Sequence, residues 1–337
     1  MTVATMARDT TANTLGRRFW AAVLSDRGQR STLGLVLLIE IILFAKVAYG
    51  FLTVNNLLNA GQATAVLMVV SVGATFGLIS GALDISVGST IALSGTVGTK
   101  IMATGIHPLL AIAMVIGVGV AVGLVNGFVV VKLRVNPIVA TLGMLGIARG
   151  LAYVLDGGSG VLGNLGTLVK DPTYTVMQKE IFDIKFSLIF AALFAVAGWL
   201  LLSRTRFGLY AYAVGGNSES GRAAALNVDR LRIMYLVVSG TCSGVAGFVL
   251  SSSQGGSAAS AAFGWELIII TAVILGGVGL TGGTGSMGGT VLGVVILGLL
   301  INGMTLAGWQ TFYQLIAQGG LLLFAVGLDA ARTGGYR

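Results

Sequence analysis

The chain has 337 residues, of which 55% are hydrophobic and only 9% charged, with a formal net charge of +8. A water-soluble domain carries charge on roughly a quarter of its residues, so this composition excludes an ordinary soluble protein and indicates an integral membrane protein. The basic residues flank apolar runs without interleaved aromatic residues, which argues against a nucleic-acid-binding protein. The single cysteine, Cys242, excludes an intrachain disulfide, and the single histidine, His107, excludes a relay of several histidines.

Ten apolar stretches follow one another along the chain. A transmembrane helix needs roughly 20 predominantly apolar residues to cross about 30 Å of hydrocarbon. The stretches that meet this requirement are 33–50, 60–80, 86–105, 109–131, 138–155, 186–203, 232–252, 266–281, 288–306 and 311–328. Glycine and serine interrupt the third and the eighth stretch, so we expect broken spans there. The sequence predicts an all-α integral membrane protein with about ten transmembrane helices.

The basic residues set the orientation of these spans. With the N-terminus in the cytoplasm, most of them fall in cytoplasmic segments, as the positive-inside rule requires. They are Arg8, Arg17, Arg18, Arg27, Arg30, Lys132, Arg134, Arg204, Arg206, Arg222, Arg230, Arg232, Arg332 and Arg337. We therefore predict a cytoplasmic tail at 1–32, a transmembrane permease domain at 33–328 and a second cytoplasmic tail at 329–337.

An even division places five spans in each half of the chain. An odd number of spans per half makes the halves run in opposite directions, an arrangement common in transporters. A glycine-punctuated similarity between Gly81–Ser89 and Gly277–Ser286 gives a weak indication of such a 5+5 inverted repeat.

Two carboxylates interrupt apolar regions in the first half. Glu40 lies in the middle of the first span, where it should point into the bundle or toward another subunit. Asp84 and Ser86 lie in a glycine-flanked segment, Gly81–Ser89, which permits a broken helix whose backbone lines a cavity. We take Asp84 and Ser86 as candidates for a translocation path. The alternative is that Asp84 caps the third span at the cytoplasmic loop.

Arg149 and Glu266 are two further candidates for the translocation path. Arg149 lies inside the fifth span, where it either lines a polar pathway or extends outward and pairs with Asp156. Glu266 begins the eighth span, where it faces a solute path or acts as a solvated cap.

The longest predicted cytoplasmic loop between spans covers 204–232. Gly215-Gly216 makes a flexible turn, Asn217 is a favourable N-cap, and Glu219 complements the dipole of a short helix over 220–226. Asn227 can end that helix in a left-handed conformation. A short helix outside the membrane can bury its Ala/Leu face only against something else, so the loop is either a docking element or an ordinary structured loop.

The glycine-rich stretch from Gly276 to Gly289 invites comparison with a phosphate-binding loop. Such a loop needs a Gly-Lys-Ser or Gly-Lys-Thr sequence, and none occurs in the chain. Close helix packing or a tight turn is the better interpretation. We expect no nucleotide site, no metal site and no catalytic residue in this chain, and hence no enzyme.

Several motifs together resemble one family. They are Leu83–Ser89 (LDISVGS), Thr141-Leu142-Gly143, Ile147–Gly150 (IARG), Gly215-Gly216-Asn217 leading to Asn227–Arg230, Leu275-Gly276-Gly277, Gly282–Ser286 and Asn302-Gly303. With them the chain resembles, from Phe51 to Asp329, the membrane permease subunits of bacterial ATP-binding-cassette (ABC) importers for ribose, xylose and related monosaccharides.

The resemblance implies a multi-pass protein of the bacterial inner membrane, with both termini cytoplasmic and no covalent chemistry of its own. It implies four kinds of partner: a cytoplasmic ABC ATPase that binds ATP and magnesium, a periplasmic sugar-binding protein, a second permease subunit in a homodimer or heterodimer, and membrane lipid. It implies no cofactor in this chain and no nucleic acid. The path would carry a pentose or a hexose.

The same resemblance identifies a helix that couples the permease to the ATPase. Its residues would be Asn217, Ser218, Glu219, Ser220, Gly221, Arg222, Ala223, Ala224, Ala225, Leu226 and Asn227. The chain departs from the family pattern here, because Ala224-Ala225 replaces the usual Ser-Gly. The added methyl group stiffens the end of the helix and puts the usual docking geometry in doubt.

Two alternatives remain open at this stage. The same machine could carry a nucleoside, a polyol, a furanose signal molecule or a branched-chain amino acid. An ion-coupled secondary transporter is the other alternative, but it requires intramembrane carboxylates or histidines as coupling sites. Only Asp84 and Glu40 are available for that role, and no histidine lies within a predicted span.

Overall fold

The computed structural model describes residues 26–157 and 167–333, and nearly all regular structure there is helical. The long helices are α2 (Asp26–Val47), α3 (Val54–Ile79), α4 (Val87–Ala103), α5 (Pro108–Lys132), α6 (Pro137–Asp156), α7 (Phe186–Arg204), α10 (Val228–Gln254), α12 (Met287–Leu306) and α13 (Thr311–Thr333). The shorter ones are α8 (Arg206–Gly216), α9 (Ser218–Ala223), α11 (Trp265–Leu275) and the 3-10 turn η2 (Val176–Gln178). Four two-residue strands complete the fold: β1 (Thr167–Leu168) pairs antiparallel with β4 (Gly256–Ser257), and β2 (Glu180–Ile181) with β3 (Ile184–Lys185).

Each of the ten predicted spans overlaps one of these helices. Among the described residues, seven helices are long and apolar enough to cross a membrane: α3, α5, α6, α7, α10, α12 and α13. The others are α2, α4 with 17 residues and α11 with only 11 residues. The eighth span is therefore shorter than predicted, because Gly277 adopts a φ of +90° and turns the chain. Of the two predicted tails, residues 1–25 and 334–337 lie outside the described residues, and α2 already begins at Asp26.

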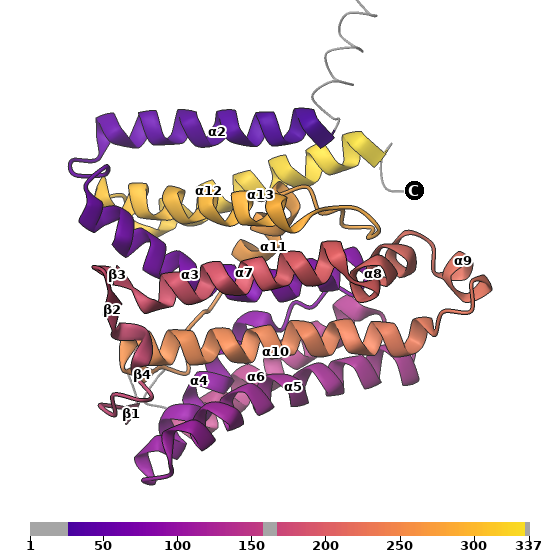
Figure 1. Ribbon diagram of the computed structural model, residues 1–337, viewed down its shortest axis with the longest axis horizontal. Coiled ribbons are helices and arrows are strands. Elements are labelled where there is room, and N and C mark those ends of the chain that lie inside the picture. The colour runs from indigo at the N-terminus through magenta and orange to yellow at the C-terminus, as the bar shows by residue number, and fades with distance from the viewer. Residues whose placement is uncertain (1–25, 158–166, 334–337) are drawn as a thin grey trace, which may run out of the picture.

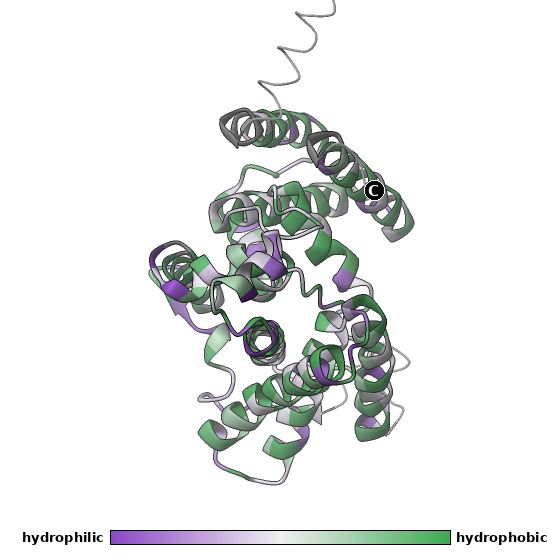
Figure 2. Ribbon diagram, turned by 90° about the vertical axis from the view of Figure 1, so that its right-hand side faces the viewer, coloured by the Kyte–Doolittle hydropathy of each residue, from purple (hydrophilic) through white to green (hydrophobic). Residues whose placement is uncertain are grey.

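The two ends of the helix bundle differ. The first residues of α2, the last residues of α13 and the short helix α9 all lie at one end, on the right of Figure 1, and the paired strands lie at the other. These are called below the α9 end and the strand end. Figure 2 looks along the bundle from the α9 end and shows hydrophobic residues over the outward faces of the helices. Large apolar side chains are exposed on α5, α6, α7 and α13, as expected for helices that face lipid.

The centre of the bundle is formed by α3 and α10, which pack against each other, while α10 also packs against α4 and α5. The crossing of α5 and α10 depends on glycine. A Cβ on Gly119 would clash with the carbonyl oxygen of Gly240, and one on Gly123 would lie 2.6 Å from the carbonyl oxygen of Leu236. Small residues let helix backbones approach closely in lipid, where dispersion contacts and not water exclusion drive association.

Two non-helical segments enter this core from opposite ends. Residues 80–86 follow α3 from the α9 end and lead into α4; residues 255–264 follow α10 from the strand end and lead into α11. The first turns of α4 and α11 meet inside the bundle, because a Cβ on Gly88 would lie only 2.6 Å from Oε2 of Glu266. The prediction that glycine and serine interrupt these two spans is thus consistent with the structure, which leaves α4 and α11 short and begins each inside the protein.

Candidate functional site

Asp84 lies at the centre of a buried polar cluster at the start of α4. Its Oδ1 accepts hydrogen bonds from the backbone N–H of Ser86 at 2.9 Å and from Ser86 Oγ at 2.6 Å. Its Oδ2 accepts one from Ser239 Oγ of α10 at 2.9 Å, and Asn126 Nδ2 of α5 donates to Ser86 Oγ at 3.0 Å. The side chain is only 3% exposed. Asp84 therefore joins the 80–86 segment to two helices, and the N-cap of α4 is Ser86 instead.

Arg149 of α6 holds the second entering segment. Its Nη1 donates to the carbonyl oxygens of Ala259 and Ala261, both at 2.7 Å, and Nη2 donates to that of Ala262 at 3.4 Å. The guanidinium also lies 5.7 Å from the ring centroid of Phe263. The predicted alternative of an outward-extending side chain is wrong, because Arg149 is 8% exposed and turned toward 259–263. Three carbonyls on one cation explain how a loop without regular structure is fixed inside the bundle.

Glu266 begins α11 next to this anchored segment. Its Oε2 is buried and has no hydrogen-bond partner among the described residues, and it faces Gly88 at the start of α4. The structure therefore groups the four predicted path residues in two places. Asp84 and Ser86 are directly bonded to each other, whereas Arg149 and Glu266 flank the 255–264 segment.

We expect Arg149→Lys to destabilise the protein by about 1.5–3 kcal/mol, since one ammonium cannot reproduce the fork that contacts three carbonyls. The measurement is the thermal unfolding midpoint of the detergent-solubilised protein. Arg206→Lys, at an exposed position, is the matched control. Equal midpoints for the two variants would contradict the anchoring role.

The short helix predicted within the loop 204–232 is present but shifted. Asn217 caps α9 as predicted, since its Oδ1 accepts from the N–H groups of Glu219 and Ser220, both at 3.0 Å. The helix covers Ser218–Ala223 and not 220–226. The left-handed residue is Ala225, at φ +61°, because Asn227 instead caps α10 through the N–H of Arg230. Most of α9 is exposed, and an ion pair between Arg222 and Asp229 at 2.8 Å joins it to α10.

Two glycine-containing turns and the end of α8 meet at the α9 end. Gly215 and Gly216 are the last residues of α8, so the predicted flexible turn at these two glycines is wrong. The N–H of Gly283 donates to the carbonyl oxygen of Ile79, the last residue of α3, at 2.8 Å. Gly215 of α8 lies so close to the same carbonyl that a Cβ there would clash with it. This is the tight turn that the sequence predicts for 276–289. It also corrects the proposed repeat: Gly81 and Gly282 are neighbours at one end of the bundle, so this glycine similarity does not relate inverted halves.

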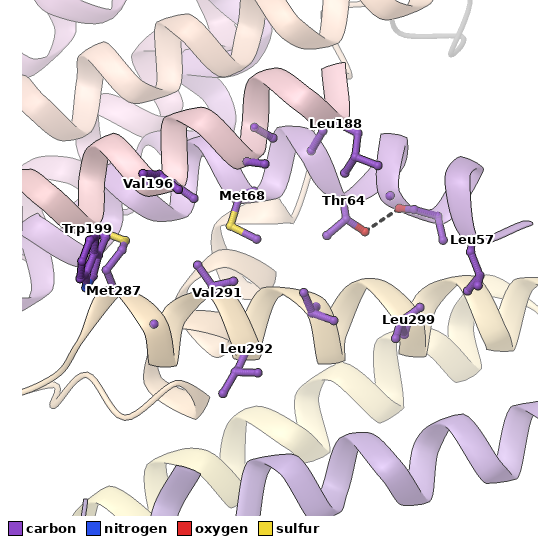
Figure 3. A pocket seen from close by; sticks show the side chains of 18 residues that line it. Leu57, Thr64, Met68, Leu188, Val196, Trp199, Met287, Val291, Leu292 and Leu299 are labelled. Carbon is purple, nitrogen blue, oxygen red and sulfur yellow. Dashed lines mark hydrogen bonds between the residues drawn. The ribbon is translucent and has the colours of Figure 1, made fainter. Parts of the chain in front are cut away.

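A cavity of about 620 Å³ lies between α3, α7 and α12. Figure 3 shows that leucine, valine, methionine and alanine side chains line it, with Trp199 at one end. Its single hydroxyl, Thr64 Oγ1, already donates to the carbonyl oxygen of Ala60 at 2.6 Å. A cavity with this lining suits an apolar occupant such as a lipid chain and offers almost nothing to a polar solute.

A second cavity, of about 390 Å³, lies between α3, α11, α12 and α13 and has a mixed lining, in which amide and hydroxyl side chains stand among a majority of apolar ones. Its residues include Asn302, Gln314 and Gln318, none of which was predicted to be a path residue. A signal was present, because Gln314 and Gln318 are four residues apart in an apolar span and so share one helix face.

The chain is similar to known transport proteins along most of its length. Residues 56–326 match the family described as branched-chain amino acid transport system / permease component. The ribose import permease protein of Escherichia coli (strain K12) is 34% identical, over 95% of this chain and 98% of its own length. The D-allose transport system permease protein of the same strain is 34% identical over 83% of this chain and 84% of its own length.

A third relative, the L-arabinose ABC transporter permease protein of Azospirillum brasilense, is 33% identical over 88% of this chain and 87% of its own length. No solved structure matches the chain with significance. The family match covers more than half of the chain, and these relatives align with nearly all of it. This protein therefore belongs to the family of branched-chain amino acid transport system / permease components.

Proposed function

We propose that this chain is the membrane permease subunit of an ABC importer that carries a monosaccharide of the pentose or hexose class. The observation that carries the proposal is the alignment with the ribose import permease protein over 95% of this chain. An alignment of this extent supports the same architecture for the two proteins. The chain provides the path and is not itself an enzyme. ATP and magnesium are bound by a separate ATPase subunit, and this chain needs no cofactor.

The proposed topology has ten spans in two inverted halves of five. The protein would lie in the bacterial inner membrane with both termini in the cytoplasm. Helix contacts support the inversion: α4 packs on α5 and α6 as α11 packs on α12 and α13, and α10 packs on α4 and α5 as α3 packs on α11 and α12. The start of α2 and the end of α13 lie at the same end of the bundle as α9, which supports a common side for both termini. Half-helices that begin inside a bundle are typical of transporters built from inverted repeats.

Three protein partners follow from the proposal. The ABC ATPase binds at residues 217–227, where α9 is exposed at the α9 end. A periplasmic sugar-binding protein delivers the solute at the strand end. A second permease subunit, identical or different, packs against faces such as those of α6 and α13, where Leu151, Val154, Leu315 and Ile316 are exposed. Alternating access moves the entering segments, and with them the path candidates Asp84, Ser86, Arg149 and Glu266.

Uptake of radiolabelled solutes tests the function. The chain is expressed with its partner ATPase and binding protein in cells that lack other sugar importers, and D-ribose, L-arabinose and D-allose are offered one at a time. We expect ATP-dependent accumulation of at least one of them. A transporter that assembles and accumulates none of these sugars would remove the assignment.

The family description supports a second candidate cargo, a branched-chain amino acid. The machine and its partners would be unchanged, and only the solute would differ. Including L-leucine in the same uptake panel distinguishes the two, because accumulation of leucine without any sugar favours the second candidate. Family membership favours an ATP-driven importer over an ion-coupled transporter.

A further inference from the structure

The cavity of about 390 Å³ with the mixed lining has the size of a small-molecule site, for which about 300–1,000 Å³ is typical. Three helices contribute side chains that can form hydrogen bonds. They are α12 with Asn302 and Thr305, α13 with Gln314 and Gln318, and α11 with Trp265. None of the residues that line it is charged. The cavity therefore suits a neutral solute that has both hydroxyl groups and an apolar face.

The α13 wall carries amide groups with unused hydrogen-bonding capacity. Gln314 Nε2 donates to Thr305 Oγ1 at 3.1 Å and to the carbonyl oxygen of Trp309 at 3.3 Å, which leaves its own Oε1 as a free acceptor within the described residues. The side chain of Gln318 forms no hydrogen bond there, although it is partly buried at the cavity. A primary amide in an apolar environment costs free energy unless it is satisfied. A solute with hydroxyl groups satisfies both the donors and the acceptors.

The α12 wall is held in a fixed orientation. Asn302 Nδ2 donates to Asn56 Oδ1 at 3.1 Å, and Asn56 Nδ2 donates to Asn302 Oδ1 at 2.9 Å. A second bond from Asn56 Nδ2 to the carbonyl oxygen of Phe51, at 2.8 Å, fixes the pair further. Asn302 thus keeps one N–H and one lone pair in a defined direction. A preorganised amide loses little entropy when a solute binds.

The α11 wall adds an aromatic surface and directly follows the 255–264 segment. The indole N–H of Trp265 donates no hydrogen bond among the described residues, and the ring lines the cavity together with the amides. It directly follows Phe263 and Gly264 of the segment that Arg149 anchors. A solute that contacts Trp265 therefore lies next to the segment that enters the bundle from the strand end.

We propose that this cavity is a binding site for a neutral monosaccharide within the permease. Gln314, Gln318 and Asn302 bind the hydroxyl groups, and Trp265 contacts the apolar face of the sugar ring. The inference rests on the proposed function. It assigns the solute contact to α11, α12 and α13 and not to the apolar cavity beside α7. Weak, multi-point binding of this kind also lets the solute leave, as transport requires.

The test uses the complete transporter, reconstituted in proteoliposomes with its ATPase and its sugar-binding protein. Gln314→Leu, Gln318→Leu and the double variant remove amides at nearly constant volume, and Gln310→Leu, at an exposed position outside the cavity, is the matched control. We expect the double variant to lower the sugar uptake rate at least tenfold, while ATP hydrolysis stimulated by the loaded binding protein stays within twofold of wild type. Wild-type uptake by the double variant would overturn the proposal, as would a parallel loss of ATP hydrolysis, which indicates a structural role.

A thiol-protection measurement gives an independent readout. The natural Cys242 is buried, so Gln318→Cys introduces the only accessible thiol among the described residues. We expect the transported sugar, and not L-leucine, to slow its modification by a small maleimide several-fold; unchanged modification in the presence of sugar overturns the proposal. If the wild-type transporter carries no sugar at all, it is the proposed function that fails. If it carries sugar and the double variant does so equally, only the assignment of the cavity fails.

Discussion

Replacing Gly215 with alanine is expected to reduce ATP-driven uptake at least tenfold, although the change adds one methyl group far from any solute. That methyl group would clash with the carbonyl oxygen of Ile79 at the end of α3, which already accepts the N–H of Gly283. To make room, α8 must move away from α3 and from the 276–289 turn. Overpacking of this kind typically costs about 1–3 kcal/mol and displaces backbone. In the proposed mechanism, this junction is where movement of α9 reaches the core helices.

The neighbouring glycine provides the control. A Cβ on Gly216 would make only an ordinary contact, 3.8 Å from the Cα of Gly283. We therefore expect Gly216→Ala to transport normally, at an equal level in the membrane. Uptake and ATP hydrolysis are measured side by side in reconstituted transporters. Continued hydrolysis with lost uptake in Gly215→Ala identifies an uncoupled machine, whereas equal uptake by the two variants rules out a role for the junction.

The positions of the spans could be predicted from sequence because lipid imposes one requirement on every helix. Each segment must be apolar for about 20 residues, and no partner has to be known for that pattern to appear. The short helices α4 and α11 are where the prediction was weakest. Apolar residues continue beyond Leu275, but the backbone turns at Gly277, and hydropathy does not detect a change in backbone dihedral angle. The inverted halves likewise depend on helix contacts that a glycine similarity could not identify.

The candidate site was predictable where a residue was chemically unusual for its surroundings. Asp84 and Arg149 could be selected because a charge inside an apolar span needs a partner. Their partners could not be named, because Ser239 and Ala259 lie more than a hundred residues further along the chain. In the coupling segment, both Asn217 and Asn227 carry capping side chains. The sequence alone does not show which helix Asn227 caps. In the structure Asn227 caps the following helix, and Ala225 adopts the left-handed conformation.

The largest loss of stability is expected from Asp84→Ala. The change removes the acceptor for four described donors: the N–H and Oγ of Ser86, the Oγ of Ser239 and, at 3.4 Å, the Nδ2 of Asn126. These groups are buried and cannot recover their bonds with water, so at about 1–3 kcal/mol for each donor left unsatisfied the change should cost about 3–5 kcal/mol or more. We expect little folded protein in the membrane and a thermal unfolding midpoint that is lower by more than ten degrees, measured in detergent by intrinsic fluorescence.

Two further variants separate the role of the cluster from a general sensitivity to lost carboxylates. Asp84→Asn keeps the shape and one acceptor oxygen for Ser86, and the hydroxyl of Ser239 can rotate to accept from the new amide, so an intermediate loss is expected. Asp229→Ala removes a carboxylate from an exposed ion pair with Arg222, for which about 1 kcal/mol or less is expected. The predicted order of stability is Asp229→Ala, then Asp84→Asn, then Asp84→Ala. If Asp84→Ala were as stable as Asp229→Ala, the 80–86 segment would have to be held in place by its backbone alone, and the buried cluster would be free to serve the solute path.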